Sequence, residues 1–499
     1  MFGGKKLWRD AAVLTLGSLL LRCAGLVFQV ILAGRLGAEG LGLFQLVLSV
    51  YGLAVSLAAA GIRYVATRLV SEELGLGRPD RAVSVLRRCF AAALILSVIS
   101  GFLLTLLSDT AADRLICDAR AGRFLRILAL SLPFCSATSV MGGWFTAVGK
   151  TSRAAAVQLF EQAVMMLLTL VLVPGAGAEQ DTAKACELIC AASVAADAAA
   201  FLFSAALYLH SRRSLGFHGG GYPAGRILAL GAPIAVTAWA RSALSTLKHS
   251  LIPAALRLSG ADPARALAAY GVVQGMAFPA LAFPAAFFYS LAEVLVPDLT
   301  RAQVGGDEGL VRETVSRSLR ICFGIASGIS ALFLAYGKPL GALLYGSAEA
   351  GVYMTALSPF VLVMYMDAVT DGMLRGLGEQ FYSMCVNLAD AVLSLAAVRF
   401  IVPIFAVRGY LALIFFSELF NFLLSFGRLV KKTGLTFTLG GLIFPPLCAA
   451  VAVSSVSFLL RLIGLSPAGA FGLAAHILLA GGAYAGLMLI RRRRDRAAA

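Results

Sequence analysis

Long apolar runs separated by short polar stretches extend through the 499 residues of the chain. Crossing the hydrocarbon core of a bilayer as a helix takes about 20 residues, and about fourteen runs reach that length. The pattern therefore predicts an all-α polytopic membrane protein with about fourteen transmembrane helices. The predicted spans are roughly 11–34, 41–67, 83–107, 124–147, 154–174, 185–209, 227–256, 266–297, 316–336, 352–374, 381–404, 408–427, 437–460 and 468–490.

The composition agrees with this pattern. Hydrophobic residues make up 60% of the chain and charged residues only 14%, whereas a soluble domain carries about 25% charged residues. No stretch poor in apolar residues is longer than about 25 residues, so we expect no separate soluble domain. The basic N-terminus resembles a signal peptide, but its apolar run is too long, and we expect it to remain as the first helix.

Basic residues are distributed unevenly between alternate loops. If the N-terminus is cytoplasmic, the cytoplasmic loops and ends hold more than twice as many Lys and Arg residues as the opposite loops. Since Lys and Arg collect in cytoplasmic loops, the pattern predicts that both termini lie in the cytoplasm. The net charge of +16 has the same origin, and we expect no binding of nucleic acid. Four arginines after the third span run against the rule: Arg114, Arg120, Arg123 and Arg126.

A repeated pattern indicates two related halves. Four residues have counterparts of the same chemistry 229 positions later: Gly143 and Gly372, Gly149 and Gly378, Glu161 and Asp390, Pro174 and Pro403. We therefore predict two six-helix repeats, spans 1–6 in residues 1–215 and spans 7–12 in residues 216–432. Two additional helices and a basic cytoplasmic tail follow in residues 433–499. Substrate sites in transporters built from parallel repeats lie between the halves, near the bilayer midplane.

Four basic residues lie inside predicted spans: Arg22, Arg63, Arg241 and Lys248. A charge at the centre of a membrane helix costs about 2.5–3.5 kcal/mol and normally faces a protein interior or a water-filled cavity. Arg241 and Lys248 are seven residues apart, so they share a helix face. We predict that the four cations line a central cavity and bind an anionic substrate, because arginine matches the geometry of phosphate. In the alternative, each cation pairs with an acid in the membrane and only locks helices together.

Span eight adds an acid and two prolines. Glu293 is a candidate counter-charge or gating partner for Arg241, and a purely structural salt bridge is the alternative. Pro279 and Pro284 are expected to bend the span, because proline removes a helical hydrogen bond. The bend serves either gating or simple packing against neighbouring helices.

Of the other acids within the spans, four are candidates for a gating or ion-binding role, and Asp197 and Glu418 are further possible partners for the cations. Asp367 and Asp371 are four residues apart near the end of span ten, and we interpret them as structural, with a gating role as the alternative. Glu161 and Asp390 are equivalent in the repeat, which favours a shared packing role. In the alternative, these two acids bind Na⁺ or H⁺.

Several other chemistries are not expected. The nine cysteines are scattered and the four histidines are widely spaced, so no disulfide framework or metal site is predicted. Gly149, Lys150 and Thr151 resemble the end of a phosphate-binding loop, but Trp144 occupies the position of the required first glycine. We therefore expect no ATPase, no enzyme and no bound cofactor. The membrane potential, Na⁺ or H⁺ remain as sources of energy.

The first two spans carry a family resemblance. The segments GSLLLRCAGLVFQVILAGRLGAEGLGLFQL and AAAGIRYVATRLVSEELGLGR resemble the start of the stage V sporulation protein B group. That group consists of polysaccharide-export-type proteins related to MurJ-type lipid II flippases, within the multidrug/oligosaccharidyl-lipid/polysaccharide (MOP) exporter superfamily. The resemblance implies that Arg22 occupies the position of a basic residue lining the flippase cavity. A second basic residue expected in those proteins is replaced here by Phe28.

Together these observations predict a flippase that works by alternating access. Its substrate would be a lipid-linked glycan such as a lipid II-like undecaprenyl-pyrophosphate precursor, used for cell-envelope peptidoglycan or spore-cortex polysaccharide. Proteins of envelope synthesis are possible partners besides the bilayer. Two alternatives remain: a cation-coupled multidrug exporter of the same superfamily, and a scaffold of an envelope-synthesis complex that transports nothing.

Overall fold

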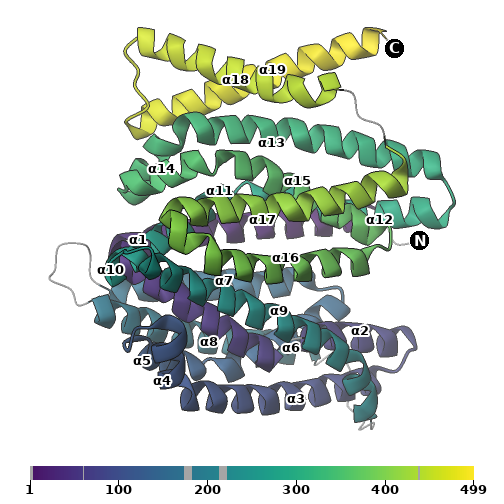
Figure 1. Ribbon diagram of the computed structural model, residues 1–499. Helices are drawn as coiled ribbons and strands as arrows, with labels where there is room; N and C mark the ends of the chain where they lie inside the picture. The colour runs from purple at the N-terminus through teal and green to yellow at the C-terminus, as the bar shows by residue number, and fades with distance from the viewer. Residues whose placement is uncertain (1–3, 60, 174–181, 213–221, 436–438, 499) are drawn as a thin grey trace. The chain divides into compact units, whose positions relative to one another are not determined.

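The computed structural model describes residues 4–59, 61–173, 182–212, 222–435 and 439–498, and every regular element in these ranges is a helix (Figure 1). Ten of these helices are long and apolar enough to cross a membrane, or up to 13 if each of three bent pairs forms one span. The chain is therefore a multi-pass, all-α membrane protein, as the sequence predicted. The count of fourteen spans stays a prediction.

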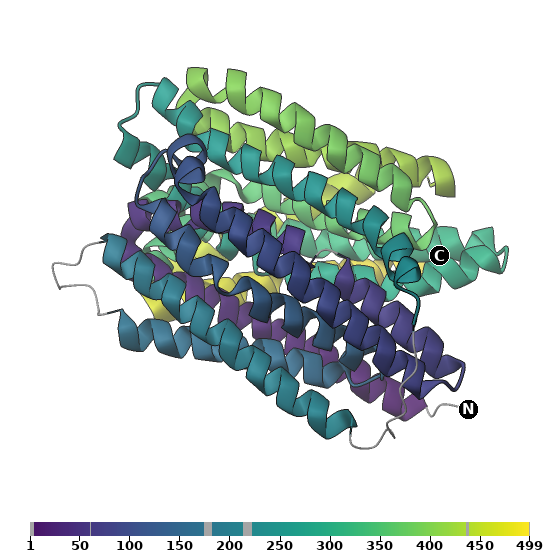
Figure 2. The ribbon, with the colours of Figure 1, turned by 90° about the horizontal axis from the view of Figure 1, so that it is seen from below.

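The chain forms two compact units, each with its own packing. We call Met1–Ala254 with Asp262–Gly271 the first unit, and Ala255–Ala261 with Val272–Ala499 the second unit. The division of the sequence into parts 1–215, 216–432 and 433–499 stays a prediction. Within the first unit the long helices run side by side, as Figures 1 and 2 both show.

The described part of the first unit contains ten helices that begin and end within it, and most of an eleventh. They are α1 (Gly4–Ala59), α2 (Ile62–Gly75), α3 (Pro79–Leu106), α4 (Ser108–Ala111), the π-helix η1 (Ala112–Ile116), α5 (Ala121–Ala129), α6 (Leu132–Ala147), α7 (Thr151–Leu172), α8 (Thr182–Arg212), most of α9 (Ala224–Leu258) and α10 (Pro263–Gly271). The apolar packing of α2, α3 and α6 surrounds the buried Trp144. This apolar cluster holds α2, α3 and α6 together within the first unit.

Helix α1 illustrates how one glycine divides a long apolar run. The helix is 56 residues long, and a straight helix of that length would measure about 84 Å, far more than the bilayer core of about 30 Å. Gly37 breaks it with φ 66° and ψ −176°, a conformation that suits a residue without a Cβ atom. The predicted turn between the first two spans is therefore a kink.

The second unit is also helical throughout its described part. Its helices are η2 (Val272–Ala277, a π-helix), α11 (Phe278–Ala282), α12 (Ala285–Val304), α13 (Glu308–Tyr345), α14 (Ala348–Ala356), α15 (Ser358–Gly376), α16 (Gln380–Phe400), α17 (Val402–Thr433), α18 (Leu439–Leu462) and α19 (Ala470–Ala498). The last two helices lie against each other (Figure 1). The side chains of the C-terminal basic tail after Arg491 lie outside the described residues.

The sequence repeat has a structural counterpart inside each unit. Helix α6 ends at Ala147 and α7 begins at Thr151. At the same offset of 229 residues, α15 ends at Gly376 and α16 begins at Gln380. The glycine in each connection has a positive φ, 69° at Gly149 and 75° at Gly378. The preceding helix pairs are bent by 46° in the first unit and 56° in the second. The repeat therefore describes local structure as well as sequence.

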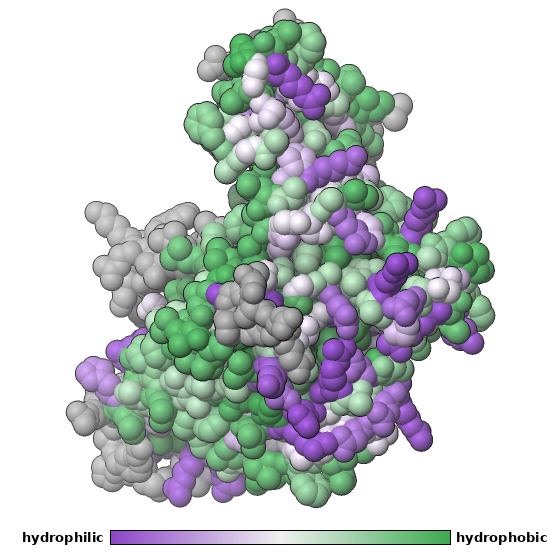
Figure 3. Space-filling model, turned by 90° about the vertical axis from the view of Figure 1, so that its left-hand side faces the viewer, coloured by the Kyte–Doolittle hydropathy of each residue, from purple (hydrophilic) through white to green (hydrophobic). Residues whose placement is uncertain are grey.

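Large apolar side chains are exposed on the outside of the helices. Hydrophobic residues cover much of the face drawn in Figure 3, and examples on α3 and α7 are Phe102 at 68% and Val171 at 71% exposure. A soluble protein seldom exposes so much continuous apolar surface. Contact with lipid accounts for it.

Candidate functional site

All four basic residues predicted to bind substrate belong to the first unit. Arg22 lies on α1, Arg63 on α2, and Arg241 and Lys248 lie on the part of α9 that packs in this unit. Arg22, Arg63 and Arg241 are exposed, and Lys248 is partly buried. The predicted partner of Arg241, Glu293, is exposed on α12 of the second unit, so this pairing stays a prediction.

Helix α9 runs antiparallel to the second part of α1 in one constant register. Thr246 donates a hydrogen bond from Oγ1 to the carbonyl oxygen of Ser49 at 2.8 Å, and Trp239 donates from Nε1 to the carbonyl oxygen of Ser56 at 3.0 Å. The two donors are seven residues apart, as are the two acceptors. Since a helix advances by about 100° per residue, Arg241 is turned roughly 200° away from Trp239.

The same rotation applies to Lys248 relative to Thr246. Arg241 and Lys248 therefore share the face of α9 that points away from α1, as their spacing predicted. Among the described residues of the first unit, no carboxylate lies within 4.0 Å of Arg241. Within the first unit, the Arg241 side chain is accordingly available to an anionic ligand.

Arg63 is positioned by the contact of α2 with α6. The carbonyl oxygen of Arg63 accepts a hydrogen bond from Oγ1 of Thr67 at 2.9 Å, and the same hydroxyl reaches the carbonyl oxygen of Gly143 at 3.2 Å. The guanidinium lies beside Gly142, where an added Cβ would come within 3.6 Å of it. Among the described residues, Arg63 also has no carboxylate within 4.0 Å.

A polar cluster in the first unit joins helices α1, α6, α7 and α8, with Ser131 at the N-terminal cap of α6. Tyr51 contacts the Ser131 hydroxyl by a short hydrogen bond, and its hydroxyl lies 3.6 Å from Sγ of Cys135. Asp197 is 8% exposed and interacts with Ser131, Cys135 and Glu161. Glu161 therefore faces a second acid on the neighbouring helix. This geometry is compatible with packing and with proton or Na⁺ binding, so both roles remain open.

A second group of acids lies in the second unit, on α15, α16 and α17. Asp371 accepts hydrogen bonds from Ser383 at 3.1 Å and from Ser425 at 3.3 Å. Asp390 accepts hydrogen bonds from Ser417 at 2.6 Å and from Ser394 at 3.3 Å. These hydroxyl donors connect the three helices to one another.

Asp367 lies within electrostatic reach of Asp371, Asp390 and Glu418. Its buried Oδ1 has no hydrogen-bond partner among the described residues, and the same holds for Oδ1 of Asn421. Like charges at close range cannot all be ionised without compensation. The group is therefore suited to hold a proton, and a gating or ion-coupling role stays a prediction.

The repeat-equivalent acids Glu161 and Asp390 point to equivalent neighbours. Glu161 on α7 interacts with a residue of α8, and Asp390 on α16 with a residue of α17. Among the described residues, no group of three or more His, Cys, Asp or Glu side chains has the spacing of a metal site. Both acids thus contribute to the contact between consecutive helices.

Pro279 and Pro284 lie at a bend in the chain. The segment Pro263–Ala282 and helix α12 are bent by 55° relative to each other. Pro279 is the second residue of α11, which follows η2 directly. The expected bend is present because Pro284 cannot donate a hydrogen bond within the helix. A gating role for the two prolines stays a prediction.

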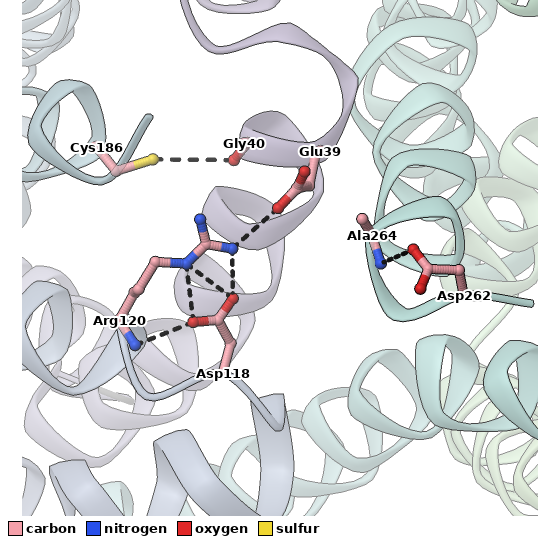
Figure 4. Close-up of polar contacts among 7 residues, drawn as sticks. All are labelled: Glu39, Gly40, Asp118, Arg120, Cys186, Asp262 and Ala264. Atoms are coloured by element: carbon pink, nitrogen blue, oxygen red, sulfur yellow. Dashed lines mark hydrogen bonds and ion pairs between the residues drawn. The ribbon is translucent and has the colours of Figure 1, made fainter. Parts of the chain in front are cut away.

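Charged residues gather at the end of the first unit that contains the Gly37 kink. Arg120 forms ion pairs with Asp118 at 2.7 Å and with Glu39 at 3.0 Å (Figure 4). Its hydrogen bonds, above all those to Asp118, raise the pKa of the Arg120 guanidinium. Arg123 pairs with Glu187 at 3.3 Å. Arg126 pairs with Asp109. Ion pairs thus give three of the four arginines that run against the charge rule a local partner.

Sequence reasoning missed most of the neutral polar residues that position the charged groups. Trp239, Thr246, Ser131, Ser417 and Asn421 were not identified in advance. Their only signal in the sequence is a polar side chain inside an apolar run. Such a signal does not reveal which neighbouring helix supplies the partner.

Comparison with known proteins supports the resemblance seen in the sequence. The MatE family model matches residues 15–171. The "Stage V sporulation protein B" of Bacillus subtilis (strain 168) is 22% identical over 396 residues, which covers 77% of this chain and 75% of that protein. The sequence is thus similar to the group that its first two spans indicated.

Solved structures establish the fold. "Lipid II flippase MurJ, inward closed conformation" superimposes with a TM-score of 0.72 at 11% identity, covering 96% of this chain and 98% of that one. An inward-facing MATE family multidrug resistance transporter of the MOP superfamily gives a TM-score of 0.63 at 17% identity, covering 84% and 98%. The chain has the fold that these two transporters share.

Proposed function

Since this chain has the fold of MOP-superfamily transporters and a sequence similar to the stage V sporulation protein B group, we propose that it is a flippase for a lipid-linked glycan. The substrate would carry a pyrophosphate, as undecaprenyl-linked, lipid II-like precursors do. The protein would move the headgroup from the inner to the outer leaflet of the bacterial plasma membrane. Both termini would be cytoplasmic, and the product would serve envelope or spore-cortex polysaccharide synthesis.

The observation that carries the proposal is the pair Arg63 and Arg241. Arg241 lies in a helix long enough to span the membrane, and Arg63 lies on α2 within the candidate membrane stretch Leu20–Gly75. Both are exposed, and neither has a carboxylate within 4.0 Å among the described residues of the first unit. An unpaired charge in a membrane helix is costly and marks a ligand pathway by default. A pyrophosphate provides the planar oxygen pairs that a guanidinium binds best.

The lipid tail of such a substrate needs no polar groups from the protein. The headgroup would be bound by Arg22, Arg63, Arg241 and Lys248, and the tail would stay in the bilayer. The acids of both units, above all Asp367 and Asp390, would serve gating or coupling to Na⁺ or H⁺. Proteins of envelope synthesis would supply the substrate and receive the product.

The test measures the exposure of headgroups on the outer leaflet of vesicles. Purified protein is reconstituted with lipid II, and a membrane-impermeant probe detects headgroups that reach the outside. We expect exposure that depends on protein, and a loss of at least roughly tenfold in Arg63→Gln and Arg241→Gln, since each removes one charged hydrogen-bonding group.

Arg301→Gln is the matched control, because the Arg301 side chain is 82% exposed and only reaches Asp298 at 4.0 Å. It should transport at the wild-type rate. Exposure that survives both Arg63→Gln and Arg241→Gln would show that these cations do not bind the substrate. An equal loss in Arg301→Gln would show a general effect of charge rather than a site.

The acids of the second unit favour one alternative, a cation-coupled multidrug exporter. Asp367, Asp371, Asp390 and Glu418 would attract a hydrophobic cation as well as a proton. Vesicles that accumulate ethidium under an imposed proton gradient, with no exposure of lipid II headgroups, would favour the exporter. The cations of the first unit speak against it, because they repel such substrates.

A further inference from the structure

The chain passes between the two units three times within a short stretch. The passages lie at Ala254–Ala255, at Ala261–Asp262 and at Gly271–Val272. Each one coincides with a place where regular helical hydrogen bonding is interrupted. The three places are Pro253 inside α9, Gly260 in the loop before α10, and the start of the π-helix η2.

Pro253 weakens α9 just before the first passage. Proline has no N–H group, so the carbonyl oxygen of His249 lacks its usual donor four residues later. The His249 side chain instead hydrogen-bonds from its ring to the Tyr270 hydroxyl at 3.0 Å, within the first unit. The part of α9 up to Ala254 is thus held in the first unit, and the part from Ala255 belongs to the second.

The second passage follows a glycine in a left-handed conformation. Gly260 has φ 91° and ends the loop after α9, where a side chain would be strained. Asp262 then starts α10: its carboxylate accepts a hydrogen bond from the Ala264 amide at 3.2 Å (Figure 4). A new rigid segment therefore begins directly after the passage.

The third passage begins in η2. Pro279 cannot donate to the carbonyl oxygen of Gly275, and a π-helix is one way in which a chain accommodates such an interruption. Gln274 in η2 donates from Nε2 to the Tyr410 hydroxyl at 2.6 Å, and Tyr410 is 1% exposed in α17. This bond fixes the first turn after the passage to the second unit.

The segment before the first passage and the segment between the second and third passages are held firmly. Trp239 and Thr246 fix α9 to α1, and a Cβ added to Gly271 would come within 2.2 Å of the carbonyl oxygen of Ala38. Helix α10 therefore lies in direct backbone contact with α1. A hinge consists of rigid segments joined by a few residues at which the helical hydrogen bonding is interrupted and the backbone can bend.

We propose that Pro253, Gly260 and η2 with Pro279 form the hinge about which the two units change their relative position during transport. The Gln274–Tyr410 hydrogen bond fixes the far end of this hinge to the second unit. The inference rests on the proposed function, because a flippase alternates between access to either side. The inference goes beyond that function by naming the residues at which the chain bends, which the fold alone does not identify.

The experiment combines hydrogen–deuterium exchange with the headgroup assay, on the full-length protein in lipid nanodiscs and vesicles. In the wild type, amides of 254–262 and 272–283 should exchange faster than those of 239–252. Pro253→Ala and Pro279→Ala each restore one backbone donor. We expect slower exchange at the substituted passage, and flipping slowed by roughly fivefold, the change that one restored hydrogen bond produces.

Pro233→Ala is the matched control, since Pro233 lies inside the same helix α9 but twenty residues before Pro253. It should slow exchange only around its own position and leave flipping unchanged. Gln274→Leu removes the hydrogen bond to Tyr410 and should make amide exchange in η2 faster still. A general loss of packing would instead speed exchange in other helices as well.

Two results would overturn the hinge. The first is that, in the wild type, amides at the three passages exchange as slowly as those of 239–252. This comparison needs no substrate. The other is wild-type flipping in Pro253→Ala and Pro279→Ala despite slowed exchange. Fast exchange at the passages without any flipping of lipid II by the wild type would contradict the proposed function and leave the hinge standing.

Discussion

Gly271 of α10 lies in direct backbone contact with Gly42 of α1. A Cβ atom on Gly271 would come within 2.6 Å of the Gly42 amide nitrogen, and one on Gly42 would come within 2.1 Å of the carbonyl oxygen of Leu267. The two helices approach this closely only because neither position carries a side chain. Small residues at helix contacts are a general means of packing in membranes.

We predict that Gly271→Ala destabilises the protein by about 1–3 kcal/mol, the usual cost of overpacking. The measurement is the unfolding temperature in detergent. Gly52→Ala is the control, because an added Cβ there meets no atom within 4 Å and alanine favours the helix. Equal melting of wild type and Gly271→Ala would mean that α10 does not pack on α1 in this way.

The register of α9 on α1 predicts a difference between two threonines of the same helix. Thr246→Val removes the hydrogen bond to Ser49 and should destabilise the protein by about 0.5–1.5 kcal/mol. Thr237 bonds only within its own helix, to the carbonyl oxygens of Pro233 and Ile234. Thr237→Val should therefore change the unfolding midpoint less. A larger effect of Thr237→Val would contradict the register.

Glu379 predicts a dependence of stability on pH. It accepts a hydrogen bond from Arg428 at 2.8 Å and lies 3.3 Å from Nζ of Lys432. The bond to Arg428 is the main reason why the pKa of Glu379 is lowered from its ordinary value of 4.5. A lowered pKa in the folded state stabilises the fold above pH 4.5, and this contribution is lost as the pH falls through the folded-state pKa.

The measurement compares the unfolding temperatures of the wild type and Glu379→Gln between pH 7 and pH 3. We expect the wild type to be more stable at pH 7 and the difference to shrink as the solution becomes acidic. The screened, surface position of the ion pair keeps the effect small. A difference that stays constant or grows on acidification would contradict the lowered pKa.

The proposed transport also predicts a dependence on voltage. Moving two negative charges outward along an inside-negative potential of 100 mV is favourable by about 4–5 kcal/mol. If the binding cations stay with the protein, headgroup exposure should accelerate when a potassium gradient with valinomycin imposes such a potential. The same vesicles without the gradient provide the control. A rate that is indifferent to voltage would exclude this driving force.

The sequence anticipated features that depend on neighbours along the chain. The apolar runs predicted the helices, and the 229-residue offset predicted the equivalence of Gly149 and Gly378, which both adopt a positive φ. The spacing of Arg241 and Lys248 predicted their common face. Each of these follows from helix periodicity, which sequence distance alone fixes.

The sequence could not predict which residue on another helix each polar side chain contacts. Nothing in the chain indicates that Thr246 finds Ser49, that Asp197 lies beside Glu161, or that Gln274 reaches Tyr410. Each of these contacts joins different helices, and apolar helices of similar composition can pack in many registers. Polar residues in them therefore indicate that a contact exists without naming its partner.

By itself, the sequence determined that this is an all-α membrane protein with an internal repeat and with cations in its spans. Lipid imposes that result, because every backbone group in the hydrocarbon must be hydrogen-bonded within a helix. Only the tertiary structure decided that Arg63 and Arg241 stay without a carboxylate in the described chain, and that its passages between units coincide with Pro253, Gly260 and η2. Those features depend on which helix faces pack together, and close packing between distant segments sets them.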